Sequence, residues 1–219
     1  MLIIDRRQQT RHILHSRQER KPILSRFAQG RRAIRRINSI VLHQTTFSRM
    51  GIDPSPEDDF DHTIAHFVVR QDGIIYRLRD YEVLLNNAHS GSSVSIEFEG
   101  NYPNIEGDYY LEDRRGRHDL RPIQASVGRH LIVQIRRELP DNQIDKIFGH
   151  VQFNPSGRAN CPGPHVWYNV AVWAKNHLQM QSTGDGAGQI PDDWENARFD
   201  LFNPEGSDQD DFLPNLYLH

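Results

Sequence analysis

Short strand-like segments alternate along this chain with amphipathic helical segments, and this alternation constrains the fold more than any other feature. Residues 37–43 form an apolar, β-branched run that is typical of a buried strand, and residues 94–99 and 144–151 also have strand character. Residues 66–78 place two strand-like runs around a Gln71-Asp72-Gly73 turn, which predicts a hairpin. We therefore expect an α/β (α+β) fold: a single domain with a central mixed β-sheet flanked by helices.

Two segments have the periodicity of helices. Apolar residues recur at every fourth position in residues 121–139, and Pro122 suits a first helical turn. A second helical pattern covers residues 166–178, after a Gly/Pro-rich loop at 155–164. The sequence shows no internal repeat and no Gly-rich phosphate-binding loop of the P-loop or dinucleotide type.

The charges are distributed unevenly over the 219 residues. We expect a basic N-terminal arm or helical extension at 1–36, the folded domain at 37–181 and an acidic C-terminal tail at 182–219. The basic positions of the arm are Arg6, Arg7, Arg11, Arg17, Arg20, Lys21, Arg26, Arg31, Arg32, Arg35 and Arg36. We interpret them as a solvated surface, with binding to an anionic polymer as the alternative, and the net charge of −3 argues against nucleic acid as the main ligand.

Apolar side chains in the tail could dock onto the domain, and the candidates are Trp194, Phe199, Leu201 and Phe212. No apolar run approaches the roughly 18 residues that a membrane span needs. The run Met1–Ile4 is too short for a signal peptide, so we expect no Sec export and a protein that is cytoplasmic as synthesised. We also expect a monomer.

Three residues form a candidate metal site. His43 and His150 each lie at the end of a predicted strand, and Cys161, the single cysteine, follows in the 155–164 loop. Two imidazoles and a thiolate suit zinc and leave a fourth position for water. The spacing alone is weak support, because strand-end histidines are more often hydrogen-bonded structural residues. A lone cysteine is likewise more often a small buried apolar group, or a reactive thiol.

The sequence resembles the type 2 N-acetylmuramoyl-L-alanine amidases, which include phage lysozyme-type amidases, cytosolic anhydromuramyl-peptide amidases and peptidoglycan recognition proteins. The resemblance extends over residues 37–178 and rests on five segments in the family's order: 40–45, 65–73, 88–91, 95–100 and 149–164. It implies one zinc ion held by His43, His150 and Cys161, where family members have Cys or Asp in the third place. It also implies that Glu97 exchanges protons with the attacking water.

Other site residues follow from the same resemblance. His89 and His66 match histidines that line the cleft, where His66 would bind substrate and His89 would support the oxyanion; a structural role for either one is the alternative. Family members often carry a lysine at the position of Ala159, and we expect Arg158 to supply that positive charge, although a guanidinium cannot donate a proton as lysine can. Ala65 replaces a tyrosine that the phage-type and recognition-type members carry.

The expected reaction is hydrolysis of the amide between the lactyl group of N-acetylmuramic acid and L-alanine of the peptidoglycan stem peptide. The expected ligands are peptidoglycan or muropeptides, and Tyr109 and Tyr110 of the polar loop 101–117 are candidates to contact them. A non-catalytic peptidoglycan-binding module is the main alternative, and an interaction protein acting through its charged ends is another. Recycling of wall fragments, host lysis and delivery as a toxin by a route other than Sec export all agree with the sequence.

Overall fold

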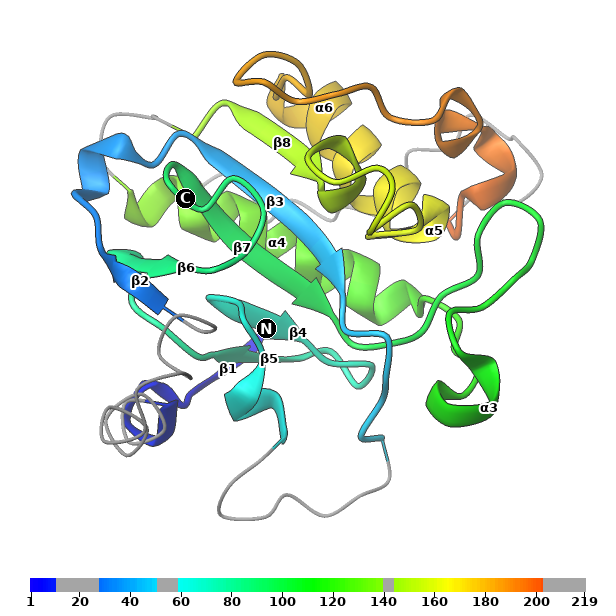
Figure 1. Ribbon diagram of the computed structural model, residues 1–219, viewed down its shortest axis with the longest axis horizontal. Coiled ribbons are helices and arrows are strands. Elements are labelled where there is room, and N and C mark those ends of the chain that lie inside the picture. The colour runs from blue at the N-terminus through cyan, green and yellow to red at the C-terminus, as the bar shows by residue number, and fades with distance from the viewer. Residues whose placement is uncertain (11–27, 51–58, 140–143, 203–219) are drawn as a thin grey trace.

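The computed structural model describes residues 1–10, 28–50, 59–139 and 144–202, and it contains a six-stranded mixed sheet with the strand order β1-β5-β4-β7-β3-β8 (Figure 1). These strands are β1 (Leu2–Asp5), β3 (Ser39–Gln44), β4 (Phe67–Val69), β5 (Ile74–Arg77), β7 (Ser93–Phe98) and β8 (Lys146–Gly149). Only the β4–β5 hairpin is antiparallel within this sheet, as the Gln71-Asp72-Gly73 turn predicted. The expected α/β class with a mixed sheet is confirmed.

The longest helix, α4 (Pro122–Glu138), covers one face of the sheet (Figure 1). Alternate strand residues such as Leu42 and Ile96 share one apolar core with the buried face of this helix, which contains Val127, Leu131 and Ile135. Gly128 permits the close approach, because a Cβ atom there would lie 2.7 Å from the Phe98 ring. The predicted helix is confirmed. The opposite face of β3 and β7 is not covered by α4 and carries His43 and Glu97.

The second predicted helical segment is continuous from residue 164 to residue 178 but changes its winding. It comprises α5 (Pro164–Val166), the π-helical turn η5 (Trp167–Val172) and α6 (Trp173–Leu178). Trp167 and Val170 are fully buried in the same core as α4. A small antiparallel pair, β2 (Ala28–Arg31) with β6 (Val83–Leu85), lies outside the main sheet.

The remaining elements are short. They are the 3-10 turns η1 (Ile34–Arg36), η2 (Asp59–His62), η4 (His150–Gln152), η6 (Asp192–Glu195) and η7 (Ala197–Phe199), and the helix α3 (Glu112–Arg115) inside the loop 101–117. No helix of the described residues is long and apolar enough to cross a membrane.

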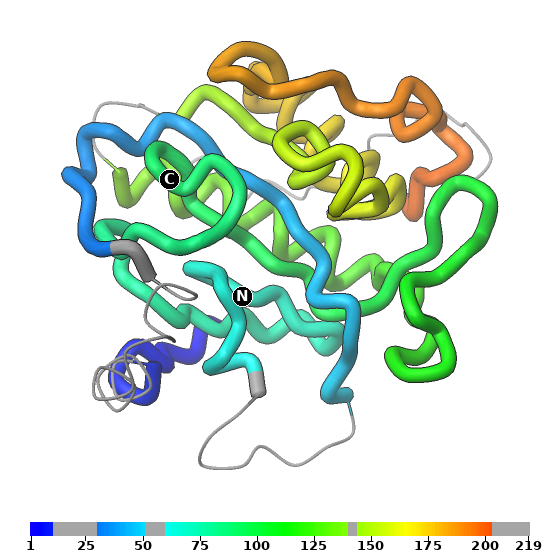
Figure 2. The backbone as a smooth tube through the Cα atoms, in the orientation of Figure 1, coloured from blue at the N-terminus to red at the C-terminus, as the bar shows by residue number. Residues whose placement is uncertain are grey.

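Both ends of the described chain pack onto the domain. The residues of β1, which fall in the predicted N-terminal arm, pair in parallel with β5 instead of forming part of a separate extension. Residues 182–202 run along the side of the molecule that carries α6 (Figure 2). Trp194 and Phe199 are buried and Leu201 is partly buried there, which confirms them as docking anchors. Phe212 and the basic positions between 11 and 26 lie outside the described residues.

Candidate metal centre

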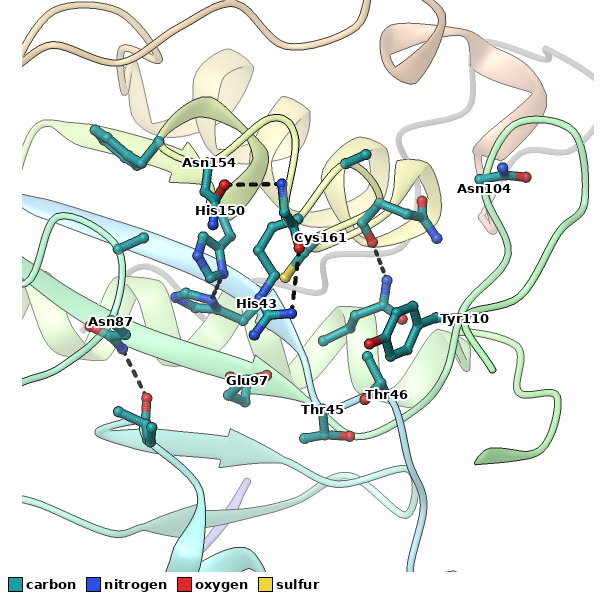
Figure 3. A pocket seen from close by; sticks show the side chains of 18 of the residues that line it. His43, Thr45, Thr46, Asn87, Glu97, Asn104, Tyr110, His150, Asn154 and Cys161 are labelled. Carbon is teal, nitrogen blue, oxygen red and sulfur yellow. Dashed lines mark hydrogen bonds between the residues drawn. The ribbon is translucent and has the colours of Figure 1, made fainter. Parts of the chain in front are cut away.

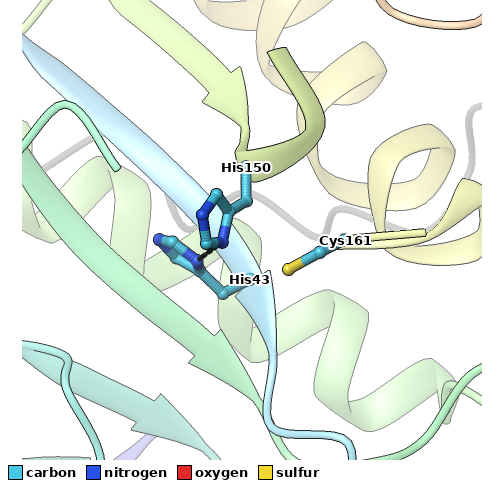
Figure 4. A group of neighbouring side chains, drawn as sticks. All are labelled: His43, His150 and Cys161. Atoms are coloured by element: carbon cyan, nitrogen blue, oxygen red, sulfur yellow. Dashed lines mark hydrogen bonds between the residues drawn. The ribbon is translucent and has the colours of Figure 1, made fainter. Parts of the chain in front are cut away.

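Parallel pairing brings the predicted metal ligands together at one edge of the sheet. His43 is the fifth residue of β3 and lies in register with Glu97 of β7, while Leu42 pairs with Gly149, the last residue of β8. His150 follows directly at the start of η4, so it emerges beside His43 (Figure 4). The carboxyl ends of parallel strands are where open α/β sheets hold their ligands.

The side chains of His43, His150 and Cys161 converge in this place. Their potential ligand atoms all lie within 4.8 Å of one another, and the two Nδ1 atoms are 2.9 Å apart. Zinc–nitrogen bonds of about 2.0–2.1 Å in a tetrahedral arrangement separate two nitrogens by about 3.3 Å. Two imidazoles and one thiol at this spacing therefore fit a zinc ion.

Unsatisfied polar atoms give a second test of that fit. The two Nδ1 atoms face each other at 2.9 Å, and one proton at most can lie between them. His43 Nε2 and Glu97 Oε2 are buried and make no hydrogen bond within the part of the chain that the structure describes. Buried polar groups are nearly always paired, so this concentration of unpaired polar atoms agrees with a site for a cation and a polar ligand.

Burial shifts the pKa of each candidate ligand. It lowers the pKa of His150 to about 4, with a further contribution from the charge of Arg158. It lowers the pKa of His43 well below its usual value, assisted by the charges of His150 and Arg158. It raises the pKa of the Cys161 thiol, as does the charge of Glu97, while the backbone N–H of Gln44 acts in the opposite direction. Both imidazoles are thus neutral and able to bind a metal at neutral pH.

Glu97 lies on the cavity face of β7 below the three ligands (Figure 3). Burial raises the pKa of its carboxyl group to about 8, although the positive charge of Arg158 opposes that shift. A carboxyl group with a pKa near neutrality can both accept and release a proton under ordinary conditions. Its position beside the three candidate ligands therefore suits the acid–base role that the resemblance implies.

The cavity around these groups has a volume of about 900 Å³. The three candidate ligands and Glu97 line it, as do other predicted site residues, namely Arg158, Tyr109 and Tyr110. Ala159, at the position where family members often have lysine, lies in the same wall. Arg158 is exposed, and its charge acts on His43, His150 and Glu97.

The structure places His66 elsewhere, and this corrects the prediction that it lines the cleft. Its side chain is buried, its Nδ1 accepts a hydrogen bond from the backbone N–H of Ser95 at 3.0 Å, and its Nε2 lies 3.1 Å from the Val83 carbonyl oxygen. With both nitrogens engaged, the ring joins β4, β6 and β7 and does not reach the cavity.

His89 also lies outside the cavity lining, in contrast to its predicted role at the oxyanion. Its ring stacks on Phe153 at 4.8 Å with an interplanar angle of 5°, and its Nε2 lies 2.7 Å from Ser92 Oγ. Phe153 does line the cavity, so His89 supports the cavity wall from behind.

Gln44 is a site residue that sequence reasoning missed. Its Oε1 accepts a hydrogen bond from the Tyr102 backbone N–H at 2.7 Å, and its Nε2 donates to the Asn160 carbonyl oxygen. Asn160 Nδ2 in turn donates to the Tyr102 carbonyl oxygen at 2.9 Å. The side chain of Gln44 therefore links β3 to both loops that border the cavity. In the sequence, the only feature that pointed to Gln44 as a site residue was its position next to His43.

Comparison with known proteins identifies the family. No curated protein matched the chain. Solved structures to which this chain is similar include the endolysin amidase LysCS from Clostridium intestinale URNW, with 22% identity over 71% of this chain and 91% of that chain, and a TM-score of 0.49. Bumblebee PGRP-SA has 15% identity, coverage of 83% and 98%, and a TM-score of 0.49. The Ph2119 endolysin from Thermus scotoductus MAT2119 bacteriophage Ph2119 has 18% identity, coverage of 76% and 97%, and a TM-score of 0.43.

A family model described as N-acetylmuramoyl-L-alanine amidase matches residues 33–164, more than half of the 219 residues. The match contains both histidines, the cysteine and Glu97. The chain therefore belongs to the Amidase_2 family of N-acetylmuramoyl-L-alanine amidases.

Proposed function

We propose that this protein is a zinc-dependent amidase that hydrolyses the bond between the lactyl group of N-acetylmuramic acid and L-alanine of the peptidoglycan stem peptide. The observation that carries the proposal is the convergence of His43, His150 and Cys161 beside the carboxyl group of Glu97 in one cavity of this protein. The chain's membership of the amidase family supports it. When bound, zinc supplies a Lewis acid that polarises the amide carbonyl and acidifies water.

The residues of the chain supply the rest of the chemistry. Glu97 accepts a proton from the attacking water and delivers it to the nitrogen of the departing L-alanine, so that the products are a free lactyl carboxylate and a peptide with a free amine. Arg158 places a permanent positive charge over the same region, where negative charge develops on the carbonyl oxygen. It stands next to Ala159 and takes over the electrostatic part of the role that lysine has in family members.

Glu97→Gln separates proton transfer from metal binding. The amide keeps the size of the side chain but cannot accept the proton, so cleavage is expected to fall by about 10²- to 10⁴-fold while the zinc content stays at one ion per chain. His150→Ala is expected to lose both zinc and cleavage. Product masses from a soluble muropeptide and elemental analysis of the purified protein measure the two quantities.

Matched controls are available on the surface. Glu106→Gln and His177→Ala change exposed residues outside the cavity and are expected to leave both readouts unchanged. Full activity of Glu97→Gln, or a wild-type protein that binds no zinc, would contradict the mechanism. Binding of muropeptides without any cleavage would favour the non-catalytic binding module instead.

A further inference from the structure

The wall of the cavity formed by loop 101–117 contains a guanidinium group that makes no ion pair with any carboxylate among the described residues. Arg115, the last residue of α3, lines the cavity and is half-buried. Its Nη1 donates a hydrogen bond to Thr46 Oγ1 at 3.1 Å, and its guanidinium carbon lies 6.0 Å from the centre of the Tyr110 ring. No carboxylate of the described residues lies within ion-pair distance of it, so most of its five N–H donors remain available.

The two neighbouring arginines, Arg114 and Arg117, do not share this combination of a position in the cavity wall and a missing ion pair among the described residues. Arg117 of the same loop is bound to Glu112, and Arg114 of the same helix is exposed and does not line the cavity. Asp108 and Glu97 are the carboxylates among the lining residues, and neither makes an ion pair with Arg115. Within the part of the chain that the structure describes, the Arg115 guanidinium therefore lines the cavity without a paired carboxylate.

The distance between the Arg115 guanidinium and the candidate metal centre limits which part of a bound peptide the guanidinium can contact. Thr46, which holds Arg115, follows the ligand His43 by three residues, so their Cα atoms are at most about 11 Å apart. Thr46 and Tyr110 lie in the same part of the cavity, away from the ligand group (Figure 3). A peptide with its first amide at the metal centre thus brings a group from one of its following residues to Arg115.

We propose that Arg115, together with the Thr46 hydroxyl and the Tyr110 ring, forms a subsite for a free carboxylate of the stem peptide beyond its first residue. The planar fork of a guanidinium matches the two oxygens of a carboxylate, and the Thr46 hydroxyl keeps its own proton to donate. The subsite makes the enzyme select peptides by the charge of that group. The proposal rests on the function proposed above.

The test combines Arg115→Gln with three soluble substrates. One is a synthetic N-acetylmuramoyl tripeptide whose second residue carries a free carboxylate, the second has that carboxylate converted to a primary amide, and the third has only its C-terminal carboxylate amidated. The wild-type protein is expected to lose about tenfold or more in kcat/KM on one of the two amides, mainly through KM, because a charge-assisted hydrogen bond is lost. The amide that shows the loss identifies which carboxylate is bound.

Arg115→Gln is expected to lower kcat/KM on the free-carboxylate substrate by about 10- to 100-fold and to abolish the preference, while kcat and the zinc content stay close to wild type. Arg115→Lys should restore part of the preference, since it keeps the charge but not the fork. Arg114→Gln is the matched control and should discriminate between the substrates as the wild type does.

Two results would overturn the subsite: equal cleavage of all three substrates by the wild type, or an equal loss on all three in Arg115→Gln, which indicates a structural role for Arg115. Complete absence of cleavage by the wild type contradicts the proposed function instead. Calorimetric binding of the same three compounds then tests the subsite separately, with tighter binding of the free carboxylate expected for the wild type and for Arg114→Gln only.

Discussion

Each of the three candidate ligand side chains is uncharged at neutral pH in the absence of metal. Burial holds the pKa of His150 at about 4 and that of His43 well below its usual value, whereas it raises the pKa of the Cys161 thiol. The imidazoles therefore need lose no proton to bind an ion, but the thiol must lose one. If the proposed zinc ion binds, Cys161 is the candidate ligand at which proton binding and metal binding would compete.

We expect zinc affinity to rise with pH for this reason. Binding releases at least the thiol proton, so the affinity of the wild-type protein should increase about tenfold per pH unit between pH 6 and pH 8. Competition with a chelator of known pH dependence measures it. In Cys161→Asp the ligand is already ionised throughout this range, and a shallower dependence is expected; identical slopes for the two proteins would show that the thiol proton is not displaced.

At the scale of the secondary-structure elements, the register of β3 determines the site. His43 and Glu97 point to the cavity face of neighbouring parallel strands because Leu42 and Ile96 point to the α4 face. A shift of β3 by one residue would bury the imidazole in the apolar core. Gln44, the last residue of β3, then attaches the two cavity loops to the end of that strand.

Gln44→Leu tests this attachment. The substitution leaves the Tyr102 N–H and the Asn160 carbonyl without their partner, and each buried unpaired group costs about 1–3 kcal/mol. A loss of stability in urea of about 2–6 kcal/mol is therefore expected for the two groups together. Zinc binding should also weaken, because Cys161 follows Asn160 directly. Gln134→Leu, on the outer part of α4, is the control and should change neither; equal effects of the two substitutions would contradict the role of Gln44.

The strands β3, β4, β5, β7 and β8 and the helix α4 could be predicted from the sequence because their apolar periodicity is set by burial on defined faces. The strand β1 could not, since its four residues are mostly exposed and acquire strand geometry only by pairing with β5. The π-helical turn at Trp167–Val172 could not be predicted from the sequence either, because a single wide turn leaves the pattern of buried residues nearly unchanged.

The candidate site likewise contains residues that could be predicted from the sequence and residues that could not. The three candidate ligands and Glu97 lie in short contiguous segments, so sequence alone could group them. The roles of His66 and His89 depend on which way each ring turns, and that is decided by Ser95 and Val83 in one case and by Phe153 in the other. Arg115 carries no motif, and only the fold brings it to Thr46.

At the scale of the whole molecule, contacts between distant segments hold both ends of the described chain on the domain. Arg6, which follows β1, donates two hydrogen bonds of 2.6 Å to the carboxylate of Asp61, whose side chain is fully buried. Near the other end, Gln152 Nε2 donates to the carbonyl oxygens of Ser182 and Gly188 at 2.9 and 2.8 Å. The domain is thus larger than residues 37–181 alone.

Arg6→Ala is expected to destabilise the protein by about 1.5–3 kcal/mol, because it removes the two charge-assisted hydrogen bonds that Arg6 donates to the Asp61 carboxylate. Chemical denaturation measures the loss, and zinc content should not change. Arg35→Ala, which removes an exposed arginine, serves as the control and should cost less than about 0.5 kcal/mol. A similar small effect for Arg6→Ala would mean that the N-terminal segment contributes little to folding.

The sequence separation between the two histidines has a thermodynamic consequence. His43 and His150 are 107 positions apart, and most of the sheet and all of α4 lie between them. An unfolded chain that gathered both imidazoles around one ion would lose about 4 kcal/mol of loop-closure entropy, which the folded chain has already lost. The ion is therefore expected to bind the native state almost exclusively, so that every tenfold rise in free zinc above the dissociation constant adds about 1.4 kcal/mol to the free energy of unfolding.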